Sequence, residues 1–125
     1  MATSGTFVFI EALNDRTLNN TVRWENSNVN PKTFNCEMKI NNNGKVSNVN
    51  VIIDKYNVVD NEGKEGVCLN FAIIENDEEQ KVLTSFVRCN NNADLEQYDL
   101  LNSLYEKVIV NSAYFDKILD LTMAF

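Results

Sequence analysis

Acidic side chains are the most concentrated chemical groups in this sequence, and they gather in two short segments. These segments contain Asp60, Glu62 and Glu65, followed by Glu75, Asp77, Glu78 and Glu79. Carboxylate oxygens bind Ca²⁺ and Mg²⁺, but the spacing of an EF-hand loop is absent because Gly63 falls in the wrong register. We therefore interpret both segments as solvated loops, and we expect them to bind a protein partner that has a basic surface.

Histidine is absent from the chain, and its absence removes several catalytic systems. Neither a Ser-His-Asp nor a Cys-His nucleophile can be built within the chain, and a metal site with histidine ligands is equally excluded. The 4 glycines form no GxGxxG or Walker pattern, which excludes the common nucleotide-binding loops. The sequence therefore predicts a protein that is not an enzyme and that has no cofactor and no metal site.

Three further side chains could carry chemistry, and each has a structural alternative. Glu11 alternates in phase with apolar neighbours and could act as an acid on an apolar face, but we expect it at a strand end or paired with Arg23 or Arg88. Arg88 itself could bind an anion, but we expect its aliphatic stem to lie on the core and its head to reach solvent. Trp24 is expected to anchor the core near a sheet end instead of forming a binding patch.

The chain contains 3 cysteines, Cys36, Cys68 and Cys89, without a CxxC spacing. In a reducing compartment, an odd number of cysteines predicts free thiols. Cys36 is expected to pack in the core as a small hydrophobic residue, and Cys89 is the second candidate for this role. An unusually reactive thiol at Cys68 or Cys89 would instead favour an enzyme that uses cysteine chemistry.

Length and composition indicate a single domain, residues 1–125. The 125 residues include 11 basic and 18 acidic side chains, and the formal charge is −7. Scattered lysines and arginines in an acidic chain are a poor match for nucleic acid or for an anionic membrane, so direct binding to either is not expected. No apolar run is long enough to span a membrane and the first residues lack signal-peptide features, so we expect an intracellular protein, cytoplasmic or nuclear.

The elements that would position these residues are clearest around Asn43-Gly44, the strongest short-range signal of a β-hairpin. Counting outward from a two-residue turn pairs Cys36 with Val51 and Phe34 with Ile53. This register places apolar side chains on one face of the hairpin and mostly polar side chains on the other. A shift of one residue would destroy the separation, so the pattern predicts this register.

Alternation predicts four further strands within residues 1–90, and helical spacing predicts two helices within residues 91–125. The strands are expected over residues 7–13, 18–25, 67–74 and 82–88, with a bulged continuation of the hairpin near 56–59. One amphipathic helix is expected over 93–110, capped by Asn91 or Asn92, and a shorter one from Asn111 or Ser112. The predicted fold is mainly β, in the β-rich α+β class: a small antiparallel barrel or sandwich of six or seven strands with two C-terminal helices packed on it.

Asparagine occurs 21 times, a bias that is typical of genomes rich in A and T. A β-rich domain of this size with two closing helices resembles several small viral accessory proteins, in architecture and composition only. The resemblance implies a viral accessory protein, and it carries over no functional residues because fold does not determine function.

The leading hypothesis is a non-enzymatic interaction protein that binds another protein through its surface. A first alternative is a barrel that encloses a small molecule in its apolar interior. The lining of such a barrel would be Phe7, Phe9, Trp24, Phe34, Met38, Phe71 and Phe86. A second alternative is a subunit of a homo-oligomer, which requires that Val46, Ile52 and Ile74 lie on a sheet face that no helix covers.

Overall fold

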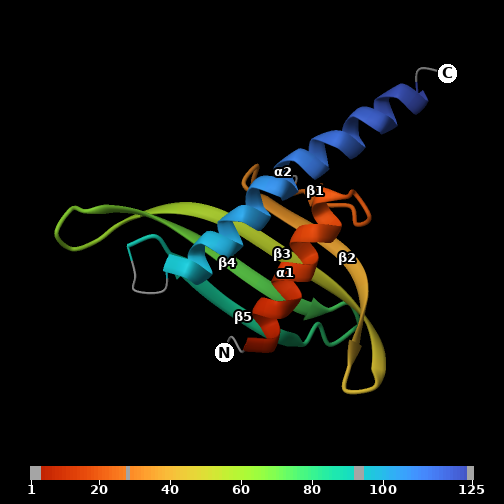
Figure 1. Cartoon of the computed structure of the whole chain (residues 1–125), viewed down its shortest axis with the longest axis horizontal. Helices are drawn as coiled ribbons and strands as arrows, with labels where there is room; N and C mark the ends of the chain where they lie inside the picture. The colour runs from red at the N-terminus through yellow and green to blue at the C-terminus, as the bar shows by residue number, and fades with distance from the viewer. Residues whose placement is uncertain (1–3, 28, 92–94, 124–125) are drawn as a thin grey trace.

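A computed structural model describes residues 4–27, 29–91 and 95–123 of the chain. It shows a helix, five strands and a second helix along the chain (Figure 1). The elements are α1 (Ser4–Leu18), β1 (Glu25–Asn26), β2 (Thr33–Asn42), β3 (Lys45–Val59), β4 (Glu65–Glu75), β5 (Val82–Cys89) and α2 (Leu95–Met123). All the strands are antiparallel and neighbour one another in chain order, so each is joined to the next by a hairpin or a short loop.

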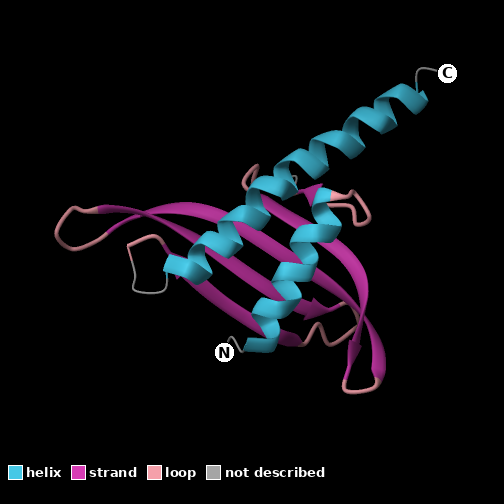
Figure 2. Ribbon diagram, in the orientation of Figure 1, coloured by secondary structure: helices cyan, strands magenta, loops and turns pink. Residues whose placement is uncertain are grey.

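Both helices lie side by side on one face of the sheet, and the other face carries no helix (Figure 2). The sheet is open, with β1 at one edge and β5 at the other. The mainly β, α+β class is therefore confirmed. The predicted barrel or sandwich of six or seven strands is wrong, because the first predicted strand is a helix and only Glu25 of the second lies in a strand, the short β1.

The N-terminal segment forms a helix because its buried side chains recur at helical spacing. Ile10, Leu13, Asn14 and Thr17 are all buried, and they lie three or four residues apart along one face of α1. Two of these four are polar, so the sequence shows a short apolar run ahead of them instead of a complete helical stripe. Such a run has no period that separates a strand from a helix, which is why the predicted strand over 7–13 is wrong.

Helix α1 ends in a Schellman motif, and this ending removes the strand predicted over residues 18–25. Asn20 adopts a left-handed backbone conformation with φ 57°. Its N–H donates to the Thr17 carbonyl at 3.1 Å, and the Thr21 N–H donates to the Arg16 carbonyl at 2.9 Å. Asparagine tolerates this conformation, so Asn20 is the local stop signal of the helix.

The hairpin predicted around Asn43-Gly44 is confirmed with its register. Phe34 faces Ile53 and Cys36 faces Val51. Asn43 and Gly44 have φ values of 53° and 82°, as a type I′ turn requires. The predicted continuation over 56–59 belongs to β3, which runs unbroken to Val59, and the register shift lies instead between β4 and β5.

Helix α2 is one continuous helix of 29 residues, so the predicted break at Asn111 or Ser112 is wrong. Asn111 and Ser112 are both buried, and the Asn111 side chain bonds to another segment instead of capping a new helix. The C-terminal part of α2 extends beyond the sheet, as Figure 1 shows. The predicted N-terminal cap Asn92 lies outside the described residues, and Asn91 precedes the described start of the helix.

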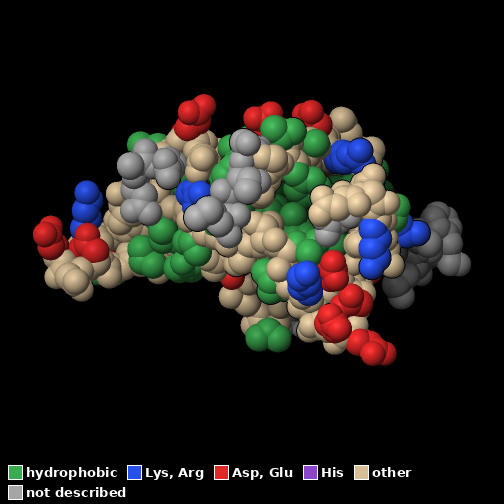
Figure 3. Space-filling model, turned by 90° about the horizontal axis from the view of Figure 1, so that it is seen from below, with side chains coloured by type: hydrophobic (Ala, Val, Ile, Leu, Met, Phe, Trp, Pro, Cys, Tyr) green, Lys and Arg blue, Asp and Glu red, His purple; other side chains and the backbone are tan. Residues whose placement is uncertain are grey.

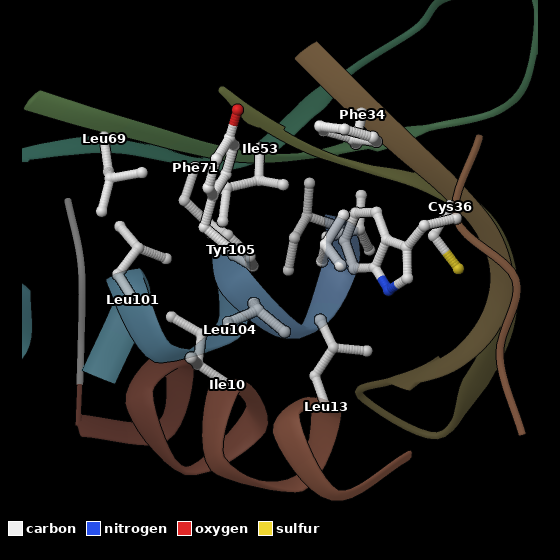
Figure 4. Packing of buried hydrophobic residues seen from close by; sticks show 14 of the residues in the cluster. Ile10, Leu13, Phe34, Cys36, Ile53, Leu69, Phe71, Leu101, Leu104 and Tyr105 are labelled. Atoms are coloured by element: carbon white, nitrogen blue, oxygen red, sulfur yellow. The ribbon is translucent and has the colours of Figure 1, made fainter. Parts of the chain in front are cut away.

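The core lies between the sheet and the two helices (Figure 4). Ile10 and Leu13 from α1 point toward the sheet, as do Leu101 and Leu104 from α2. These four side chains and their partners from the sheet have at most 1% of their surface exposed. The partners are Val49, Val51, Ile53, Leu69 and Phe71. Burial of this apolar surface is the main stabilising term of the fold.

A buried hydrogen-bond network around Asn111 joins α2 to the segment between α1 and β1. The Asn111 amide donates to the Val22 carbonyl at 2.9 Å and to Asn20 Oδ1 at 3.0 Å. Its oxygen accepts the Trp24 N–H at 2.9 Å, while the Trp24 indole donates to Thr17 Oγ1 at 3.0 Å. Asn111 is 1% exposed, so its loss would leave these backbone groups buried without partners.

We therefore predict that Asn111→Ala lowers the free energy of unfolding by about 3 kcal/mol, because several buried donors and acceptors lose their partner. Asn102→Ala is the matched control, because this half-buried asparagine of α2 accepts one bond from the Lys55 ammonium. We expect the control to cost less than about 1 kcal/mol. Urea unfolding followed by Trp24 fluorescence measures both values, and equal losses would contradict the role of Asn111.

Candidate functional site

The two predicted acidic loops lie at opposite ends of β4. One connects β3 to β4, and the other connects β4 to β5 (Figure 1). The 11 residues of β4 rise about 3.3 Å each, so the loops are roughly 35 Å apart. The structure therefore does not bring the two segments together into one site.

The aspartates of these loops shape the turns, whereas most of the glutamates face solvent. Asp60 Oδ1 accepts two backbone N–H groups of its own loop at 2.9 Å, and Asp77 Oδ1 accepts two at 3.0 Å. Glu62, Glu65, Glu78 and Glu79 are exposed, as are the two aspartates, and Glu75 is half-buried. A partner can therefore bind the glutamates without breaking the hydrogen bonds that form the turns.

Few of the charges pair within the molecule. Among the side chains of residues 5–27, 29–41, 43–91 and 95–118, the only ion pair joins Arg23 to Glu25, with 3.6 Å between Nη2 and Oε1. Both of these side chains are exposed, and such pairs contribute little to stability. The acidic side chains of the hairpin loops are consequently free of internal basic partners.

A groove of about 430 Å³ lies between the N-terminal parts of α1 and α2. Its lining combines apolar side chains with two carboxylates and an amide: Phe7, Val8, Glu11, Glu96, Gln97 and Leu100. Glu11 is exposed on a helix, so its predicted place on the apolar face of a strand is wrong, and it forms no ion pair with Arg23 or Arg88. The groove thus brings together carboxylates from the two ends of the chain.

Sequence reasoning missed Glu96 and Gln97 as lining residues of this groove. Helical spacing would have placed Phe7 and Glu11 one turn apart on α1, but the segment was predicted to be a strand. No local signal in the sequence marks the approach of α2 to this part of α1.

Arg88 lies on the core face of β5 as predicted, but its head packs against the protein instead of simply reaching solvent. The centre of its guanidinium lies 4.9 Å from the Phe86 ring and 5.6 Å from the Phe7 ring, within the range of cation–π attraction. Its Nε donates to Gln97 Oε1 at 2.7 Å, and its Nη1 donates to the Val87 carbonyl at 2.8 Å. Arg88 therefore links β5 to α1 and α2.

Trp24 is 1% exposed and anchors the core, as the sequence predicts. Its neighbour Arg23 lies over the Phe115 ring of α2, with 5.9 Å from the guanidinium carbon to the ring centre. The pair Arg23 and Trp24 therefore packs against the molecule and does not form a surface aromatic patch.

The structure corrects the prediction of three free thiols. Cys68 and Cys89 face each other on β4 and β5 and form a disulfide, with 4.1 Å between their Cα atoms. Cys36 is free and 1% exposed, as predicted for a core residue. Disulfides are rare in reducing compartments, so the redox state of this pair bears directly on the expected intracellular location.

The aromatic residues predicted to line a barrel do not enclose an interior. Helices fill the apolar face of the open sheet, and Phe34, Phe71 and Phe86 are buried against them. Five hollows of about 250 to 430 Å³ that the described residues line are open to the surface and enclose no interior. The barrel that a small-molecule site required is therefore contradicted.

The helix-free face of the sheet carries the apolar residues predicted for self-association, but polar residues interrupt them. Ile52 lies opposite Ala72, and Ile74 lies opposite Asn50. Ile52 and Ile74 are half-buried, whereas Val46 is 67% exposed near the hairpin turn. On this face of β3, Asn48 and Asn50 separate Val46 from Ile52, so the three side chains do not form one continuous apolar patch.

Among the described residues, no three His, Cys, Asp or Glu side chains are close enough to hold a metal ion. None of the described helices is long and apolar enough to cross a membrane. Comparison with protein-family models, with curated proteins and with solved structures finds no match to this chain.

We predict that the three cysteines differ in reactivity toward iodoacetamide. Burial, with smaller contributions from Glu37 and Glu25, raises the pKa of the Cys36 thiol to about 11, so this thiol is protonated at about pH 8 and should resist alkylation in the folded protein. Unfolding without a reductant should add one label, and unfolding with a reductant should add three.

Mass spectrometry counts the labels in each condition. Cys36→Ser is the control, and it should take no label until a reductant is added. Three labels without a reductant would contradict the Cys68–Cys89 disulfide, and rapid labelling of the folded protein would contradict the burial of Cys36.

Proposed function

We propose that this chain is a non-enzymatic module that binds another protein with a basic surface. The observation that carries the proposal is the set of exposed glutamates that have no internal basic partner, on a chain of net charge −7. A basic partner gains their attraction without breaking ion pairs inside the module. The long-range field of the acidic chain also accelerates the encounter with such a partner.

The positions of the acidic loops support a steering role. They lie at opposite ends of β4, so no compact ligand can contact both. Each loop attracts basic groups separately, because salt screens exposed charges over about 10 Å and the loops lie much farther apart. The exposed glutamates therefore affect mainly the rate and the salt dependence of binding.

The test is affinity capture from a lysate of the natural source, followed by binding measurements with the purified partner. We predict that Glu62→Gln with Glu65→Gln, or Glu78→Gln with Glu79→Gln, weakens binding about fivefold at low salt, because exposed charge pairs contribute less than about 1 kcal/mol each. Increasing the salt from about 50 to about 300 mM should reduce the difference. Asp60 and Asp77 remain unchanged because they form the turns.

Asp15→Asn with Asp99→Asn is the matched control, because it removes the same charge from exposed positions on the helices. This control should weaken binding less than either loop variant. Equal losses of affinity in the control and in the loop variants would show that only the net charge matters and that the position of the glutamates does not. Capture of a small molecule or a nucleic acid with no protein partner would contradict the proposed function.

A further inference from the structure

The two edges of the sheet differ in their protection against strand pairing. At one edge, β1 pairs with the first part of β2. The unpaired part of β2 that comes next carries the exposed charged residues Glu37 and Lys39. On the other side, no described element pairs with the outer edge of β5, an eight-residue strand. Natural sheets blunt such edges with charges, proline or a covering segment. β5 contains no proline, and its one charged residue is Arg88.

The outward backbone groups of β5 follow from its pairing with β4. The Asn90 N–H donates to the Val67 carbonyl at 3.0 Å, so residue 90 points its backbone toward β4. Residues of an antiparallel strand alternate in this respect, so Ser85 and Val87 point their N–H and C=O groups away from β4. The Arg88 guanidinium covers the Val87 carbonyl, and no described side chain bonds to the backbone of Ser85.

The groove between the helices opens beside this edge. The rings of Phe7 and Phe86 lie 5.2 Å apart, and Arg88 of β5 bonds to Gln97. Phe7 and Gln97 both line the groove, so its wall continues directly from the helix-facing side of β5. The lining includes two carboxylates, and the Arg88 guanidinium lies against its edge, where it bonds to Gln97 and covers the Phe7 ring.

Figure 3 looks onto the side of the molecule that carries β5. Acidic side chains lie at the left end, along the upper margin and at the lower right of this view, and hydrophobic side chains form separate patches between them, with lysine and arginine side chains nearby. Val82 and Val87 of β5 are 54% and 42% exposed, and Val8 of the groove is 64% exposed. This surface therefore combines apolar side chains, free backbone groups and nearby carboxylates.

We propose that an extended segment of a partner protein pairs with β5 as an additional strand and places a lysine or arginine side chain beside Glu11 and Glu96. The proposal rests on the proposed protein-binding function and names its surface. Hydrogen bonds to the backbone groups of Ser85 supply affinity for the added strand. The groove supplies specificity, because its carboxylates favour a basic side chain of the partner segment. Charge complementarity favours a basic segment over a second copy, because a second copy would bring a further −7 to the same edge.

The probe is a capped synthetic peptide of about eight residues, the length of β5, that alternates threonine and valine and has one central lysine. A matched peptide has glutamate in place of the lysine. We predict that the lysine peptide slows hydrogen exchange at the amides of Ser85 and Val87. It should bind about tenfold more tightly than the glutamate peptide, because two carboxylates attract the first and repel the second.

Ser85→Pro is the decisive variant, because it removes an outward N–H that the ladder to β4 does not use. Ser85→Pro should lower the affinity for the lysine peptide by at least about tenfold. The proline removes the N–H donor, and its ring obstructs the approach of a further strand to β5. Lys39→Pro is the matched control: counting from the turn at Asn43-Gly44 places Lys39 at an outward position of β2, and binding should not change. Urea unfolding shows that both variants are folded.

Glu11→Gln combined with Glu96→Gln tests the groove separately. These side chains are exposed, so the substituted protein should remain folded and should lose the preference for the lysine peptide over the glutamate peptide. Glu62→Gln combined with Glu65→Gln is the control at a distant loop, and it should retain the preference.

Several outcomes would overturn the proposal. These are absence of peptide binding at millimolar concentration, equal binding of the two peptides, protection of amides outside β5, and protection of β5 that rises with protein concentration without peptide. The last outcome would assign the edge to a second copy. If Ser85→Pro leaves binding of the captured partner unchanged, the β5 site fails and the protein-binding function stands; if no protein partner exists, that function fails.

Discussion

The buried amide of Asn111 is the constraint on which the arrangement of the helices depends. It sits in the middle of α2 and binds the backbone of the segment that connects α1 to the sheet. The two helices come from opposite ends of the chain, and the hydrophobic effect alone does not specify their orientation. A fully bonded polar group does so, because any other position of α2 would leave buried donors and acceptors without partners.

This arrangement determines which surfaces of the protein are free. Both helices cover one face of the sheet, so the other face and the outer edge of β5 have no described cover. The groove beside β5 exists because α1 and α2 separate toward their N-terminal ends. Its carboxylates, Glu11 and Glu96, come from different helices, so the chemistry of the groove depends on the polar network that orients α2.

The cysteines show how register assigns different roles to the same residue type. Cys36 is on the helix-facing side of β2, where burial keeps its thiol protonated. Cys68 and Cys89 face each other across β4 and β5 on the opposite side of the sheet. The register between these two strands follows a longer loop with a shift near Ile73, so no local pattern reveals that the two sulfur atoms meet.

Local rules determined the hairpin of β2 and β3, because the type I′ turn and the alternation of side chains act within a few residues. The place of Arg88 on the core face of β5 was predictable for the same reason, whereas Trp24 is buried although the strand predicted over residues 18–25 does not form. Helix α1 was not predictable from its apolar residues alone, because Asn14 and Thr17 complete its buried face only through bonds to residues of α2 and to Trp24. The groove and the disulfide were decided by tertiary structure, since each joins residues that only long-range packing brings together.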